Sequence, residues 1–132
     1  LINESCQATF DVASIEFGEN SFWVFQDIGY EIKCKLNNPV NELEDRLVQE
    51  GWNCSPFPEE MVKEILSDTA FRREMYQLNN STKSYWLYLD VDALRNGKKD
   101  DRMSAFQYRT PHYLVALYIP EDNVLYYLEY SI

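Results

Sequence analysis

The residue best suited to acid–base chemistry is His112, the only histidine of the chain. It follows Pro111 at the predicted start of a strand. An imidazole titrates near neutral pH, so His112 could act as a general acid or base. A surface or capping histidine fits the same position. The motifs of serine hydrolases, zinc proteases and phosphate-binding loops are absent from the sequence, so no reaction follows from His112 alone.

Asp90 and Asp92 form the best candidate for a cation site. Alternate residues of a strand point to the same side of a sheet, where two carboxylates can bridge a hard cation. A strand end that runs into solvent explains the same residues, and the sequence offers no third ligand beside them. We therefore predict neither a bound metal nor another cofactor.

The strongest signal is charge. The chain has 132 residues, with 22 acidic and 12 basic side chains and a net charge of −10. Residues 1–68 contain 14 acidic and four basic residues, whereas the remainder contains eight of each. A protein of this charge repels nucleic-acid phosphates and anionic membranes and attracts basic proteins. We expect no direct contact with nucleic acid, because two aspartates interrupt the only basic cluster, at residues 98–109.

Tyrosine is concentrated near the C-terminus, where residues 85–130 hold eight of the ten tyrosines. Each buried hydroxyl needs a hydrogen-bond partner, so a core rarely collects so many. In the last predicted strand Tyr126 and Tyr130 share one face and Tyr127 lies on the other. We expect at least one of these sets to reach the surface, where tyrosines and carboxylates commonly bind proteins. A sheet covered by helices is the alternative explanation.

Strand periodicity dominates both ends of the chain. The apolar residues are even-numbered at 10–12 and odd-numbered at 15–17. A β-bulge near Ala13–Ser14 explains this change of parity, because the extra residue keeps both pairs on the buried face. Further strands are predicted at residues 22–25, 30–36, 85–91, 113–119 and 124–130, the last two forming a hairpin around residues 120–123.

Helical periodicity occupies the middle of the chain. Asn38 and Pro39 suit a helix start and Gly51 suits its end. The expected buried stripe of this helix comprises Val40, Leu43, Leu47 and Val48. The chain is predicted to be a single compact domain, residues 1–132, of the α+β class. Its N-terminal strands and C-terminal hairpin form a mainly antiparallel sheet, with two or three helices, at about 39–50 and 58–78, packed on one face.

The cysteines indicate a reducing compartment. Cys6, Cys34 and Cys54 are odd in number, and their spacings match no zinc or redox motif. Cys34 lies in an alternating apolar register and is predicted to be buried. The longest apolar runs have four residues, far short of the about 20 that cross a bilayer. We therefore expect a cytoplasmic protein that does not bind membranes.

Charge and tyrosine content together predict a small acidic protein that binds and inhibits a basic partner. A negative surface can occupy the cleft in which a nuclease receives phosphates, and in this character the chain is similar to bacterial immunity proteins, which neutralise toxins. The predicted partner-binding residues are acids of the two helices and tyrosines of the hairpin: Glu42, Asp45, Glu59, Glu60, Glu64, Tyr126, Tyr127 and Tyr130.

Two other functions fit the same sequence. One is a small enzyme or ligand-binding domain, in which His112 and Asp90 or Asp92 enter an aromatic-lined pocket. The other is a structural subunit or homodimer that pairs through the edge of the C-terminal hairpin. The inhibitor hypothesis requires the surplus carboxylates of residues 1–68 to lie together on one surface.

Overall fold

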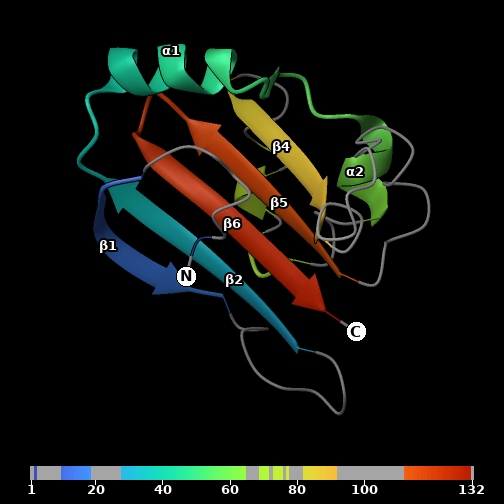
Figure 1. Cartoon of the computed structure of the whole chain (residues 1–132). Helices are drawn as coiled ribbons and strands as arrows, with labels where there is room; N and C mark the ends of the chain where they lie inside the picture. The colour runs from blue at the N-terminus through green and yellow to red at the C-terminus, as the bar shows by residue number, and fades with distance from the viewer. Residues whose placement is uncertain are drawn as a thin grey trace.

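The computed structural model describes residues 2, 10–18, 28–64, 69–71, 73–75, 77, 82–91 and 112–131. Its strands form one antiparallel sheet in the order β1-β2-β6-β5-β4-β3 (Figure 1). The predicted α+β class is confirmed. The elements are β1 (Val12–Phe17), β2 (Ile28–Leu36), α1 (Val40–Gln49), β3 (Asn53–Cys54), α2 (Glu59–Glu64), β4 (Tyr85–Asp90), β5 (His112–Ile119) and β6 (Val124–Ser131).

The predicted hairpin, β5 and β6, forms the centre of the sheet. β6 pairs with β5 on one side and with β2 on the other, and β4 covers the second edge of β5. All eight residues of β5 are buried. The hairpin edge that we predicted as a possible dimer contact is therefore not available, because both strands already have hydrogen-bonded neighbours on each side.

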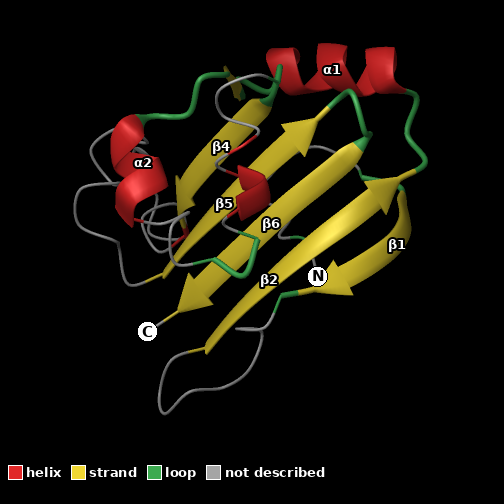
Figure 2. Ribbon diagram, turned by 180° about the vertical axis from the view of Figure 1, so that it is seen from behind, coloured by secondary structure: helices red, strands yellow, loops and turns green. Residues whose placement is uncertain are grey.

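The helices are divided between the two faces of the sheet, rather than packed on one face as predicted. Leu43 and Leu47 of α1 join one apolar cluster, whereas Phe57, Met61 and Met75 join the cluster on the opposite face. Figure 2 shows α2 on the side of the sheet that faces the viewer and α1 across the ends of the strands. The central strands are apolar on both sides, so each face needs its own cover.

β1 contains the predicted β-bulge. The register between β1 and β2 shifts between Val12 and Ser14. Beyond the bulge, Ile15 and Phe17 point to the same face as the buried cluster on the α1 side. They are nevertheless 40% and 57% exposed, because β1 is an edge strand of the sheet. The parity was predicted correctly, and the burial was not.

α1 ends as its glycine predicts. Gly51 has a φ of 79°, in the left-handed region. Its N–H donates to the carbonyl of Val48 at 3.1 Å, and the N–H of Trp52 donates to that of Leu47 at 3.0 Å. These two bonds satisfy carbonyls of the last turn in a Schellman arrangement.

The buried stripe of α1 is narrower than predicted. Leu43 and Leu47 are 3% and 0% exposed, whereas Val48 is 57% exposed. Val48 lies about 100° around the helix from Leu47, beyond the stripe that faces the core.

The remaining predicted elements are found in part. The helix expected at 58–78 is observed as α2 and as helical residues at 73–75 and 77. The strand expected at 22–25 lies outside the described residues. Cys34 is fully buried, as predicted, and burial raises the pKa of its thiol.

Candidate protein interface

Two of the three predicted tyrosine anchors lie inside the protein. Tyr126 is 4% exposed, Tyr127 is 0% exposed and Tyr130 is half-buried. Their hydroxyls donate to the carboxylates of Glu74, Glu129 and Glu31, respectively. Tyr126 and Tyr127 therefore cannot contact a partner in this conformation. We expected exposed tyrosines because each buried hydroxyl needs a hydrogen-bond partner. The three carboxylates supply these partners.

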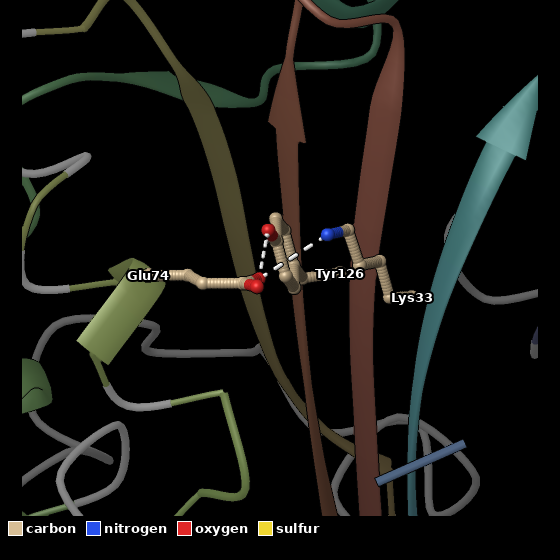
Figure 3. Close-up of polar contacts among 3 residues, drawn as sticks. All are labelled: Lys33, Glu74 and Tyr126. Carbon is tan, nitrogen blue, oxygen red and sulfur yellow. Dashed lines mark hydrogen bonds and ion pairs between the residues drawn. The ribbon is translucent and has the colours of Figure 1, made fainter. Parts of the chain in front are cut away.

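Tyr126 shows how such a hydroxyl is accommodated. Its OH donates to Oε2 of Glu74 at 2.6 Å, and Nζ of Lys33 lies 3.3 Å from the same oxygen. Figure 3 shows the three side chains meeting there, with Lys33 reaching across from β2. Burial, and then the hydrogen bond to Glu74, raise the pKa of Tyr126 far above its ordinary value. The positive charge of Lys33 is thus paired within the protein.

The polar groups of the enzyme hypothesis do not meet. Asp90 pairs in register with Tyr113, so His112, the preceding residue of β5, points to the opposite face of the sheet. His112 instead places Nε2 3.5 Å from Oε2 of Glu129. Asp92 lies outside the described residues, within which no group of three metal-ligating side chains occurs. The described part of the chain therefore does not assemble the predicted polar pocket.

The acids of α2 lie apart from those of α1. Glu59 and Glu60 are exposed in the first turn of α2, whereas the side chain of Glu64 lies outside the described part. Nζ of Lys63 is 2.8 Å from Oε1 of Glu59, and this hydrogen bond lowers the pKa of that carboxyl. α2 flanks the sheet while α1 crosses its end (Figure 1). The predicted helical acids thus fall on two surfaces rather than on one. The carboxylates of residues 1–68 therefore do not form the single surface that the inhibitor hypothesis required, and only those near α1 remain candidates for the interface.

The acids of α1 are joined by others at the same end of the sheet. Glu42 and Asp45 are exposed and three residues apart, which places them on one side of the helix. The exposed residues Glu121 and Asp122 lie in the turn between β5 and β6, and this turn ends beside α1 (Figure 1). Asp122 also lines a hollow with Lys35 on the face of the sheet that α2 covers. Asp11 precedes β1 at this end. We call Asp11, Glu42, Asp45, Glu121 and Asp122 the acidic end.

Two asparagines hold the three segments of the acidic end together. Oδ1 of Asn38 accepts the N–H of Asp11 at 2.8 Å, and the N–H of Asn37 donates to the carbonyl of Asp11 at 2.7 Å. Nδ2 of Asn123 donates to the carbonyls of Leu36 and Asn38, both at 3.0 Å. Segments distant in sequence are therefore fixed to one another by hydrogen bonds.

Asn123 also stabilises its own turn. Its φ of 52° lies in the left-handed region, which asparagine tolerates better than most residues. The OH of Tyr118 donates to Oδ1 of Asn123 at 2.6 Å, and the N–H of Asn123 donates to the carbonyl of Pro120 at 3.2 Å. Burial, with a smaller contribution from the charge of Glu44, raises the pKa of Tyr118 to about 12.

Most of the basic charge near the acidic end is already paired. Nε of Arg46 lies 3.0 Å from Oε1 of Glu50, and Nζ of Lys83 lies 3.7 Å from Oε2 of Glu44. Lys35, at the end of β2, is exposed. Among the described residues, none forms an ion pair with a side chain of the acidic end. Within the described part of the chain its five carboxylates therefore carry no ion pair, although Lys35 and Asp122 line the same hollow.

A hollow of about 220 Å³ lies beside Glu42 and is lined by Asn38, Pro39, Leu43 and Arg46 as well. One water occupies about 30 Å³ of liquid, so the hollow can receive the end of a lysine or arginine side chain. Glu42 and Arg46 give the lining of this hollow one acidic and one basic side chain.

Only part of the acidic end was predicted from the sequence. Glu42 and Asp45 were among the predicted helical acids, whereas Glu121 and Asp122 were predicted only as part of the turn at residues 120–123. Their types in the turn between two strands were visible in the sequence. Their proximity to α1 was not, because it depends on the bonds made by Asn123 across more than 80 residues of chain.

Comparisons of the chain with models of protein families, with curated proteins and with solved structures find no match. None of the described helices has the length and apolar character of a membrane-spanning segment. The function proposed below therefore rests on the charges and contacts of the described residues.

Proposed function

We propose that this protein binds a basic protein partner through the acidic end. The observation that carries the proposal is the joining of Asp11, the α1 acids and the turn acids by hydrogen bonds of Asn38 and Asn123. These bonds hold the backbone segments that carry the carboxylates, so the segments need no further ordering on binding, and the grouped charges attract a basic partner over a distance.

In its specific form, the proposal is an immunity-type inhibitor that acts in the cytoplasm. The acidic end would cover the phosphate-binding cleft of a basic nuclease toxin and thereby exclude nucleic acid. The net charge of −10 supports this form, because it favours encounter with a strongly basic domain. The carboxylates act as fixed charges in this proposal and not as catalysts.

A charge-reversal experiment tests the proposal. Tagged wild-type protein is used to capture proteins from a lysate at low and at high salt, beside a double variant with Glu42→Lys and Asp45→Lys. A double variant with Glu59→Lys and Glu60→Lys in α2 is the matched control. We expect a basic partner to bind the wild type and the α2 variant, to be released by salt, and to bind the α1 variant at least about tenfold more weakly, since close charge pairs across interfaces contribute about 1.5 kcal/mol or more.

Two results would count against the proposal. Equal capture by the α1 variant would show that the acidic end is not the interface. Loss of capture by the α2 variant alone would move the interface to α2. The immunity form is tested separately, by measuring whether the purified protein inhibits nuclease activity of the captured partner; an unaffected nuclease would contradict it. Circular dichroism of each variant verifies that it is folded.

A further inference from the structure

β1 presents backbone groups at the edge of the sheet. It is the terminal strand of the sheet and pairs with β2 on one side. The N–H of Gly18 donates to the carbonyl of Glu31 in β2 at 2.7 Å. Alternate residues of an antiparallel strand direct their N–H and C=O groups to the same side, so the groups of Glu16 point toward β2. Those of Ile15 and Phe17 consequently point outward, where no described residue bonds them.

The side chains of β1 give this edge two different faces. Ile15 and Phe17 are opposite Cys34 and Ile32 of the buried cluster, so the apolar face of the sheet continues to its edge. They remain 40% and 57% exposed. Glu16 points to the other face and is also exposed. An added strand would therefore meet apolar groups on one face and a carboxylate on the other.

We propose that β1 receives an extended segment of the basic partner as an additional strand of the sheet. This inference rests on the proposed function and names the mode of binding. The segment alternates apolar residues, which pack against Ile15 and Phe17, with lysine or arginine on the face of Glu16. Main-chain hydrogen bonds to the outward groups of Ile15 and Phe17 supply affinity, and the alternation supplies specificity.

A basic segment fits this edge better than a second copy of the chain does. Pairing β1 with itself would bring together two molecules that each carry a net charge of −10. β1 also begins directly after Asp11, a residue of the acidic end. A basic partner that lies on the acidic end is thus positioned to extend a strand along β1.

A short peptide that alternates lysine and valine, blocked at both ends, is the probe. Amide hydrogen exchange of the intact protein is followed by NMR with and without this peptide. We expect exchange at the amides of Ile15 and Phe17 to slow by at least about tenfold, because these amides become hydrogen-bonded. A peptide of the same composition with its lysines grouped together is the control for charge alone, and it should leave these amides unchanged.

Two substitutions of one residue separate backbone pairing from side-chain contact. Ile15→Pro removes the outward N–H and leaves the hydrogen bonds between β1 and β2 in place. Ile15→Ala removes the apolar side chain and keeps the N–H. We expect the proline variant to bind the alternating peptide at least about tenfold more weakly than the alanine variant does, since it loses a hydrogen bond at a desolvated edge. The protected amide of Glu16 reports that β1 still pairs with β2.

Three outcomes would overturn the inference. The first is equal binding of the alternating peptide by the Ile15→Pro and Ile15→Ala variants. The second is equal slowing of amide exchange by the alternating and grouped peptides. The third is a wild-type protein that sediments as a dimer and already protects the amides of Ile15 and Phe17. If Ile15→Pro does not fold, exchange in the wild-type protein still decides the question. With the captured partner, full affinity of Ile15→Pro beside lost affinity of Glu42→Lys with Asp45→Lys would refute strand addition and leave the acidic end as the interface.

Discussion

Substitution of Asn123 by alanine is predicted to destabilise the protein strongly. The side chain of Asn123 accepts a hydrogen bond from the hydroxyl of Tyr118 and donates hydrogen bonds to the carbonyls of Leu36 and Asn38. Each of these bonds contributes about 1 kcal/mol. Alanine at a φ of 52° lowers the free energy of unfolding by about 1–2 kcal/mol more, because this backbone conformation is unfavourable for it. We expect the free energy of unfolding to fall by about 4 kcal/mol.

Thermal unfolding followed by circular dichroism measures this loss. With an unfolding entropy of about 2.1 cal/mol/K per residue, the expected loss lowers the Tm by about 14 °C. Asn123→Gly is the matched variant, because it loses the same side-chain bonds and tolerates a positive φ. Its Tm should fall by about 10 °C. An alanine variant that melts within about 4 °C of the wild type would refute the role that we assign to Asn123.

The remaining predictions concern the core and a buried tyrosine. Leu47→Ala should lower the free energy of unfolding by about 3 kcal/mol, measured by denaturant titration. Val48→Ala, on the exposed side of α1, should change it by less than about 0.5 kcal/mol. Similar effects of the two substitutions would contradict the buried stripe observed on α1. Because the pKa of Tyr118 is about 12 in the folded protein and 10.0 in its ordinary state, the folded protein keeps a proton that the unfolded chain loses. This stabilisation is complete below pH 10 and is lost as the pH rises toward about 12, so Tyr118→Phe should reduce the fall in stability across that window; an unchanged slope would contradict the assignment.

Much of the local structure could be predicted from the spacing of residues. Alternation predicted the strand ending at Leu36 and the hairpin around residues 120–123, and the change of parity after Val12 predicted the bulge. Gly51 predicted the end of α1. These features depend on neighbours within a few residues, because strand parity, turn geometry and helix termination are set by local backbone preferences.

The acidity of the chain was likewise visible in the sequence, but its arrangement was not. Spacing alone makes the acids of the two helices equivalent, as polar positions on amphipathic helices, whereas α1 and α2 cover different parts of the sheet. The turn that carries Glu121 and Asp122 is held at the α1 end of the sheet because Asn123 bonds to the chain between β2 and α1. The tyrosine content was also known, whereas the carboxylates that allow Tyr126 and Tyr127 to be buried come from Glu74 and Glu129.

Residue types and their spacing are enough to establish the net charge of −10, the types of the described elements and the side of each strand on which a residue lies. Folding of the whole chain establishes which strands are central, which acids lie near one another and which strand is left at the edge. Periodicity specifies only the faces of an element, whereas the pairing of distant segments depends on hydrogen bonds and burial that form together when the whole sheet closes.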